Sequence, residues 1–343
     1  MRCGLIARAD AGGLAQMTVE FARHMNPARV VIVDLGDSGR GPMNLDRLAF
    51  LNPWQMMVTS NPIGDDPWEW LLDGSDVLYT AETAYRPGWC DQAAGRGVAT
   101  ILHAMPELYA GDEPDSLVVP TTWERQRLPW ATRLGVPVAT DLFPFSQRTE
   151  ARRFLCAPGP AFHDRDGLNI IIEALPHVRE ECTILLRTSQ PEETGRRLER
   201  FGLPPNVTIE LHRPWPRYDQ LPDFDALLLP RRYGGLSLPM QEAAALGRPT
   251  LTLTREPNRG FLSRPLQAQG HIDHQATMKG GRFDVWDVDP RHYAAIIDNT
   301  IRRPDLFTEA STRCGEWAET SSWQARAGEY HHLVEATVEG AHG

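Results

Sequence analysis

The chain has 343 residues, of which 41% are hydrophobic and 23% charged, a composition typical of a globular enzyme and a length that suits two domains of about 150 residues each. No apolar run approaches the roughly 18 residues that span a bilayer, and residues 1–7 are too short an apolar stretch for a signal peptide, so we expect a cytoplasmic protein. The net charge of −10 argues against indiscriminate binding of nucleic acid.

The first half of the chain alternates short apolar runs with amphipathic segments, which predicts an α/β domain with a parallel sheet. Apolar residues recur at helical spacing over 14–25, and Gly12-Gly13 stands between this predicted helix and the first strand. These elements form a βαβ unit. Strands are predicted at 4–7, 30–34, 76–80, 99–102 and 117–120.

The segment 136–153 contains Pro137 and Pro144 and predicts a hinge, after which a second βαβ series begins. Ligands of open α/β sheets bind at the carboxyl ends of the strands. Two such halves therefore predict a cleft enzyme or binding protein for a phosphate-bearing ligand. In the second half, strands are predicted at 154–157, 183–187, 207–211, 226–229 and 250–253, helices at 167–175, 191–201 and 240–246, and a mostly helical chain from residue 290.

The most informative motif is the segment 230–249, PRRYGGLSLPMQEAAALGRP, which lies between two predicted strands. Pro239 suits the start of a helix, where its missing N–H has no cost, and Gly247 suits the end. A helix N-terminus beside a glycine-rich loop is an anion-binding site. Glu242, expected in the first turn of this helix, can accept hydrogen bonds from ribose hydroxyls.

This segment resembles the donor-binding motif of the retaining GT-B glycosyltransferases of family 4, roughly E-G-F-G-L-P-x-x-E-A-x-A-x-G-x-P. Leu238-Pro239, Glu242-Ala243 and Gly247 fall in register with it, as do Ala245 and Pro249. The family's first Glu, which contacts the donor sugar, falls on Gly234, so backbone N–H groups of 234–237 are expected to hold the sugar instead. The alternative is a generic Rossmann strand–loop–helix.

The resemblance implies an α/β chain with the GT-B fold, in which two Rossmann-like domains face each other across a cleft. We expect an N-terminal acceptor domain at 1–147, a nucleotide-sugar donor domain at 148–315 and a helix at 316–343 that returns to the N-terminal domain. Ser322-Trp323 resembles the start of the returning part, where Trp323 packs. The implied reaction is metal-independent transfer from a nucleotide sugar, most simply a UDP-sugar, to a hydroxyl acceptor with retention and without a cofactor.

The resemblance also implies the donor residues. Where the family places basic residues for the diphosphate, this chain has Pro158-Gly159 and Asp166, so Arg165 is the nearest candidate and Arg187, at the end of the next strand, is a second. The alternative for Arg165 is a surface side chain paired with a neighbouring aspartate. The expected donor-binding residues are Arg165, Arg187, Gly234, Gly235, Leu236, Ser237, Leu238 and Glu242.

In the N-terminal half, the loop with Arg8, Gly12 and Gly13 corresponds to the family loop that touches phosphate or acceptor. His103 ends a predicted strand where the family often has a histidine near the reacting carbon, and Asp10 also follows a strand. We therefore name His103 and Asp10 as catalytic candidates. The alternatives are a buried histidine with satisfied hydrogen bonds and a carboxylate that caps a helix.

The acceptor is less defined. Residues 4–27 are similar to a subgroup found in bacteriophage genomes, which implies 5-hydroxymethylcytosine or another hydroxylated pyrimidine in phage DNA, and host cytoplasm, as one possibility. Trp123, Arg125, Arg127 and Arg133 interleave aromatic and cationic residues as a DNA-facing groove would. The alternatives are a solvated helix face with core tryptophans, or a non-catalytic GT-B-like binding protein. A monomer or a homodimer is compatible with the sequence.

No metal site is expected. His271, Asp273 and His274 have metal-like spacing, but they stand between glycines and predict a solvated loop. The five cysteines are odd in number and never form a CxxC pair, which predicts neither a disulfide framework nor a zinc site.

Overall fold

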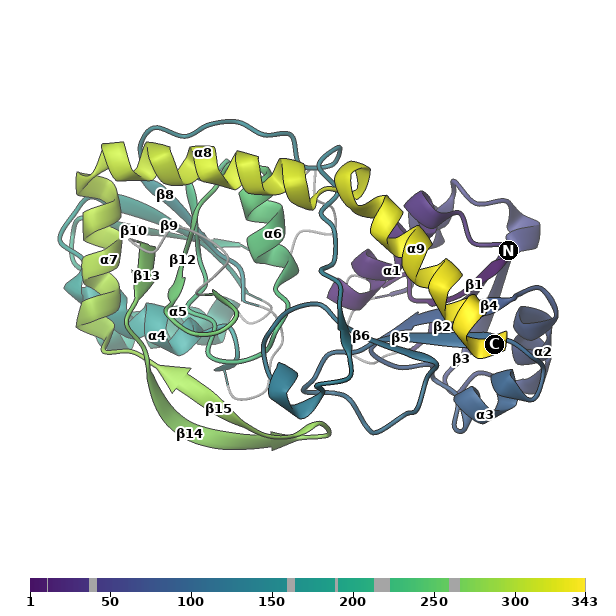
Figure 1. Cartoon of the computed structure of the whole chain (residues 1–343). Coiled ribbons are helices and arrows are strands. Elements are labelled where there is room, and N and C mark those ends of the chain that lie inside the picture. The colour runs from purple at the N-terminus through teal and green to yellow at the C-terminus, as the bar shows by residue number, and fades with distance from the viewer. Residues whose placement is uncertain are drawn as a thin grey trace. The chain divides into compact units, whose positions relative to one another are not determined.

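The computed structural model of the chain describes residues 1–10, 12–36, 42–158, 164–188, 191–212, 223–258 and 266–342. These residues form two compact units, drawn in Figure 1. The N-terminal unit consists of Met1–Pro137 together with Trp323–Gly343, and the C-terminal unit is Val138–Ser322. The chain therefore passes between the units after Pro137 and again after Ser322, whereas the sequence placed the divisions after residues 147 and 315.

The N-terminal unit is built on a parallel sheet of seven strands in the order β3-β2-β1-β4-β5-β6-β7. Strands β1, β2, β4 and β5 are apolar and almost wholly buried, as expected for a parallel sheet covered on both faces. The strands are β1 Cys3–Ala7, β2 Arg29–Asp34, β3 Met56–Ser60, β4 Val77–Ala81, β5 Ala99–His103, β6 Ser116–Val119 and β7 Thr132–Arg133, and the helices are α1 Gly13–Met25, α2 Asp65–Asp73, α3 Trp89–Ala94 and α9 Trp323–His342.

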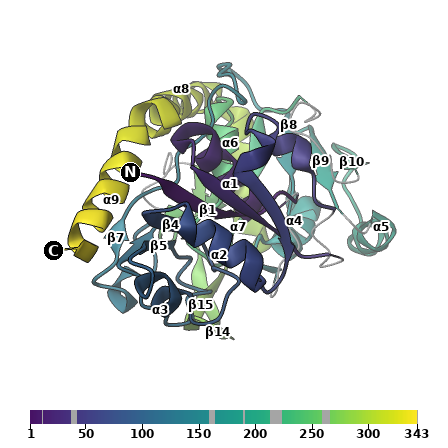
Figure 2. The same cartoon turned by 90° about the vertical axis from the view of Figure 1, so that its right-hand side faces the viewer.

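Helix α9 completes the N-terminal unit by packing against α1, β4 and β5, and Figure 2 shows it on the unit that carries the N-terminus. The Trp323 side chain is 1% exposed, and its ring stacks on His24 of α1 at a centroid distance of 4.8 Å. The Tyr330 hydroxyl donates a hydrogen bond to the Gly135 carbonyl oxygen at 3.2 Å. The C-terminal helix is thus an integral part of the N-terminal unit's core.

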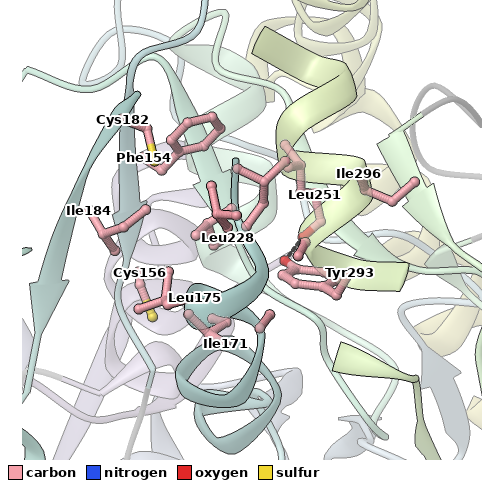
Figure 3. Close-up of a cluster of buried hydrophobic side chains, with 14 of the residues drawn as sticks. Phe154, Cys156, Ile171, Leu175, Cys182, Ile184, Leu228, Leu251, Tyr293 and Ile296 are labelled. Atoms are coloured by element: carbon pink, nitrogen blue, oxygen red, sulfur yellow. Dashed lines mark hydrogen bonds between the residues drawn. The ribbon is translucent and has the colours of Figure 1, made fainter. Parts of the chain in front are cut away.

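The C-terminal unit has a parallel sheet of six strands in the order β10-β9-β8-β11-β12-β13. Its largest apolar cluster joins this sheet to α4 and α7, and the Tyr293 hydroxyl within it bonds the Leu251 carbonyl oxygen at 2.8 Å (Figure 3). The strands are β8 Arg153–Cys156, β9 Cys182–Arg187, β10 Val207–His212, β11 Ala226–Leu228, β12 Thr250–Leu253 and β13 Gln267–Ala268, and the helices are α4 Leu168–Ala174, α5 Pro191–Phe201, α6 Leu238–Ala245, α7 Pro290–Arg302 and α8 Pro304–Ser321.

A hairpin of β14 (His271–Met278) and β15 (Gly281–Asp287) stands outside both parallel sheets. The sequence predicted a solvated loop for its first residues: they are exposed as predicted, but they form a strand and not a loop. Ala276 and Val285 of the hairpin are buried against Tyr233, which immediately precedes the glycine pair of the motif. This contact supplies the apolar face that stabilises an otherwise isolated two-stranded sheet.

Both sheets share one topology. In each, the strand order reverses at the first strand, between β1 and β4 and between β8 and β11. Both units are therefore Rossmann-like, and sheets of this kind bind ligands at the carboxyl ends of the strands where the order reverses. None of the helices in the described ranges combines the length and the hydropathy needed to cross a membrane.

Candidate functional site

The candidate site of the C-terminal unit is formed by the loops that follow three neighbouring strands, β8, β11 and β12. The loop after β11, residues 230–237, is called here the switch-point loop because it borders the position where the strand order reverses. It leads directly into α6, whose N-cap is Ser237. Gly234 in this loop has a φ of +94°, a conformation that side chains other than glycine rarely adopt.

The switch-point loop is fixed first by the loop after β8. The Arg232 N–H donates a hydrogen bond to the Arg165 carbonyl oxygen at 2.7 Å, and the Arg231 guanidinium lies 3.5 Å from the Asp166 carboxylate. Gly167 has a φ of +74°, and a Cβ at this position would lie 2.7 Å from Cγ of Pro230 and overlap the Pro230 carbonyl. The two loops therefore touch at a place where only glycine fits.

The second support is Arg255, which follows β12 and is 1% exposed. Its Nε donates to the Arg231 carbonyl oxygen at 2.7 Å, and its Nη2 donates to the Gly234 carbonyl oxygen at 2.9 Å. One guanidinium group thus holds both ends of a four-residue turn. The planar fork of arginine suits such paired acceptors.

The third support is Arg232, which joins the switch-point loop to the β14–β15 hairpin. Its Nε donates to the Trp286 carbonyl oxygen at 2.8 Å, and its Nη2 lies 2.7 Å from the Asp273 carboxylate. Asp273 also accepts from His274 at 2.9 Å, and this hydrogen bond, followed by the charge of Arg232, lowers the pKa of Asp273. Of the residues with metal-like spacing, Asp273 thus anchors Arg232 and is itself bonded by His274, and no cluster of metal-ligating side chains occurs in the part of the chain that the structure describes.

The arrangement leaves a set of hydrogen-bond donors at the start of α6. Within the described ranges, no backbone carbonyl accepts a hydrogen bond from the N–H groups of 234–237. The Ser237 side chain makes no capping hydrogen bond, and its buried hydroxyl has no partner among the described residues. Free N–H groups at a helix N-terminus carry a partial positive charge, so this cradle can hold an anion such as a phosphate.

The predicted donor residues can now be placed. Gly234, Gly235 and Leu236 form the switch-point loop with Ser237, and Leu238 begins α6. Glu242 is the fifth residue of α6 and half-buried, so the prediction that it lies in the first turn is wrong. It lies one turn further from the cradle, because the helix begins at Leu238.

The two arginine candidates occupy different positions. The Arg165 side chain is 31% exposed, and its Nε lies 3.9 Å from Asp166, a loose pairing of the kind the alternative anticipated. Its backbone carbonyl supports Arg232, as described above. Arg187 ends β9, the strand beside β8, and is half-buried.

In the N-terminal unit, Arg8 and Asp10 form a buried ion pair at the carboxyl end of β1. Arg8 Nε donates to Asp10 Oδ2 at 2.7 Å, and the Gly12 N–H donates to Asp10 Oδ1 at 2.6 Å. Gly12 is the N-cap of α1 and Gly13 its first residue. Burial lowers the pKa of Arg8, but Tyr85 and Asp10 outweigh burial and leave that pKa raised. Both carboxylate oxygens of Asp10 are therefore bonded, but Asp10 does not cap α1, whose N-cap Gly12 has no side-chain capping bond.

His103 lies inside the N-terminal unit. Its ring is 0% exposed, and Nδ1 lies 2.8 Å from the Tyr79 hydroxyl. Burial lowers the pKa of His103 from 6.5 to about 3. Its neighbours include the rings of Tyr79 and Tyr330. A ring without exposed surface cannot touch a substrate in this conformation. The alternative of a buried histidine with satisfied hydrogen bonds is met in part, because Nδ1 is bonded whereas the buried Nε2 has no partner among the described residues.

The residues proposed to contact DNA are dispersed between core and surface. Trp123 is 6% exposed, and its ring therefore offers no face for stacking on a base, contrary to the prediction. Arg127, in a single 3-10 turn, lies 3.8 Å from Glu124, and Arg133 is exposed on β7. The side chain of Arg125 lies outside the described part of the structure.

Sequence reasoning missed Arg255 and Arg232 as residues of the site. A signal was present for Arg255, because a charged residue directly after a buried strand sits at the carboxyl edge where ligands bind. For Arg232 the signal was absent, since its partners belong to a hairpin that the sequence did not predict.

Comparisons with known proteins agree with this fold. No family model matches the chain, and none of the curated proteins is similar to it in sequence. Among solved structures, the Anabaena protein Alr3699/HepE in complex with UDP and glucose matches with a TM-score of 0.69 at 11% identity, over 98% of this chain and 100% of that one. A glycosyltransferase from Rickettsia africae matches with a TM-score of 0.68 at 11% identity, over 98% of each chain.

The lipopolysaccharide outer core galactosyltransferase WaaB is a third similar structure, with a TM-score of 0.64 at 12% identity over 98% of this chain and 99% of that one. Two of these three structures are named as glycosyltransferases, and the third holds UDP and glucose. The chain therefore has the GT-B fold, as the sequence predicted.

The close approach of Gly167 to Pro230 makes a testable prediction. Gly167→Ala places a Cβ against the Pro230 carbonyl, whereas Gly202→Ala, at a similar φ of +70°, meets no atom within 4 Å. We expect Gly202→Ala to lower the free energy of unfolding by about 1–2 kcal/mol through backbone strain, and Gly167→Ala to lower it by about 1–3 kcal/mol more through overlap. Urea unfolding of both variants measures this, and equal losses would contradict the contact.

The burial of His103 makes a second prediction. Below pH 6.5 the unfolded chain binds a proton at His103 and the folded chain does not, so stability falls as the pH falls from about 6.5 toward about 3. The slope from this residue is about 1.4 kcal/mol per pH unit. We expect His103→Gln to remove it, so that the wild-type protein loses more stability than the variant between pH 7 and pH 4.5. Parallel unfolding curves across this range would show that His103 is solvated.

Proposed function

We propose that the chain is a glycosyltransferase that transfers a sugar from a nucleoside-diphosphate sugar to a hydroxyl acceptor. The observation that carries this proposal is the cradle at the start of α6, where the N–H groups of 234–237 and the Ser237 hydroxyl have no partner among the described residues. Its position at the reversal of strand order is where open α/β sheets bind nucleotides. The neighbour HepE, solved with UDP-glucose and with UDP and glucose, supports a UDP-sugar as the donor.

The parts of a nucleotide sugar match the parts of the site. The cradle supplies fixed N–H donors for a diphosphate, and the carboxylate of Glu242, one turn further into α6, suits the hydroxyls of a ribose. Arg165 and Arg187 are the cationic side chains proposed for the outer phosphate oxygens. In the transfer step, the bond between the sugar carbon and the diphosphate oxygen breaks, and negative charge grows on the leaving phosphate. Preorganised donors stabilise that charge.

The part of the site proposed to hold the sugar differs from the family motif. At the position of the family's first Glu stands Gly234, whose carbonyl oxygen accepts a hydrogen bond from Arg255. We therefore propose that the backbone N–H groups of 235–237 hold the sugar or its phosphate. The retaining course and the independence from a divalent cation are part of this proposal and rest on the resemblance of 234–249 to the family motif.

The experiment described below also tests two alternative functions. The first is transfer to hydroxymethylated DNA. Trp123 is too buried to stack on a base, whereas Trp130 is 66% exposed and Arg133 is also exposed. A non-catalytic nucleotide-sugar-binding protein would use the same cradle without turnover.

The test of activity is a donor and acceptor panel. The protein is incubated with UDP-glucose, UDP-galactose, UDP-N-acetylglucosamine and GDP-mannose, each with simple glycosides or with DNA containing 5-hydroxymethylcytosine, with and without EDTA. We expect release of nucleoside diphosphate with at least one donor, unchanged by EDTA, and an α-linked product from an α-linked donor. Binding without turnover under all conditions would favour the non-catalytic alternative, and absence of binding would reject the proposal.

Glu242 gives a separate prediction about the donor nucleoside. Glu242→Gln keeps the shape of the side chain and removes its charge, and a hydrogen bond to a charged group is worth about 1.5–3 kcal/mol. We expect the Kd for UDP, measured by titration calorimetry, to rise by roughly tenfold or more. Glu173→Gln, an exposed residue of α4, is the control and should leave the Kd unchanged.

A further inference from the structure

Arg255 is the one residue described above that is buried, cationic and in contact with the switch-point loop at two separate places. It is 1% exposed and binds the carbonyl oxygens of Arg231 and Gly234. It also donates to the carbonyl of its neighbour Glu256. Full burial of a guanidinium group is expensive unless its N–H groups are bonded, and here each of its nitrogens donates to a backbone oxygen.

The orientation of the loop follows from these two bonds. In a trans peptide the C=O and the N–H of one peptide group point in opposite directions. The peptide that joins Gly234 to Gly235 is trans, since the cis bonds in the described ranges are Asn61-Pro62 and Glu256-Pro257. Because the Gly234 carbonyl points toward Arg255, the Gly235 N–H points away from Arg255.

The other bonded peptide verifies this geometry. The Arg231 carbonyl points toward Arg255, and the N–H of the same peptide, on Arg232, reaches the Arg165 carbonyl on the opposite side at 2.7 Å. Arg255 thus lies on one side of the loop, and the Arg232 N–H leaves on the other side, where Arg165 lies. The bond to Gly234 also explains the φ of +94° at that residue, which a side chain such as the family's Glu would not tolerate.

We infer that Arg255 is a positioning residue for donor binding, which turns the switch-point loop so that the Gly235 N–H faces the diphosphate or the sugar. It acts through the backbone and does not itself touch the ligand. The ligand side of this inference rests on the proposed function. The orientation of the loop does not, so the two can be tested apart.

The experiment compares three variants of the full chain with the wild-type protein. Arg255→Met removes both bonds to the loop, and Arg255→Lys keeps a charge but cannot span both carbonyls. Arg248→Met is the matched control, because Arg248 is also buried and bonds the backbone oxygens of Ser146 and Leu246, at the far end of α6. Thermal unfolding, amide hydrogen exchange of peptides covering 231–242, and titration with UDP are measured on each.

We expect Arg255→Met to raise amide exchange in 232–237 and to weaken UDP binding by roughly 10- to 100-fold, the range typical when a group that orients the binding groups is removed. Arg255→Lys should fall between the wild-type protein and Arg255→Met. Arg248→Met should lower the unfolding temperature while leaving exchange in 232–237 and UDP binding near the wild-type values.

Two results would overturn the inference. The first is unchanged exchange of 232–237 in Arg255→Met, which would show that other contacts hold the loop. The second is an equal loss of UDP affinity in Arg248→Met, which would reduce Arg255 to a general stabiliser of the unit. If the wild-type protein binds no UDP and none of the nucleotide sugars in the panel, the proposed function fails, and the exchange data alone decide whether Arg255 positions the loop.

Discussion

The candidate site depends on one recurring interaction, the binding of backbone carbonyl oxygens by buried guanidinium groups. Loops at the carboxyl edge of a parallel sheet take no part in the hydrogen bonds between strands. Their carbonyl oxygens therefore need other donors wherever these oxygens are buried. Arg255, Arg231 and Arg232 supply these donors around the switch-point loop, and Arg248 does the same at the other end of α6. All but one of the 35 basic residues of the chain are arginines, the side chain whose fixed fork suits this use.

This interaction also explains how the motif can depart from the family pattern. An acidic side chain at position 234 would need a residue other than glycine at a φ of +94°. The carbonyl group of residue 234, which accepts a hydrogen bond from Arg255, would then have to point in another direction. Gly234 and Arg255 therefore form one unit, because the glycine permits the backbone conformation in which its carbonyl oxygen accepts the bond from Arg255. The segment indicates the class of reaction better than it indicates the sugar.

Much of the architecture followed from local patterns. Buried strands such as β1, β5 and β11 are short apolar runs, and Gly247 ends α6 with a φ of +75°, as its place in the sequence predicted. The strands that escaped prediction lack such a pattern: β3 is largely exposed and β7 has only two residues. The hairpin was missed because its apolar face is completed by Tyr233, which is remote from it in sequence. Burial of His103 and Trp123 depends on packing across the N-terminal unit, which no local pattern reports.

The β14–β15 hairpin has a consequence for how this chain can change over evolution. Its anchor, Arg232, belongs to the same short loop that forms the candidate ligand cradle, and its apolar support, Tyr233, is the next residue. A replacement of that loop by the version from a chain without the hairpin would leave two strands without support and Asp273 without its cation. A graft that replaces the switch-point loop must therefore carry the hairpin with it.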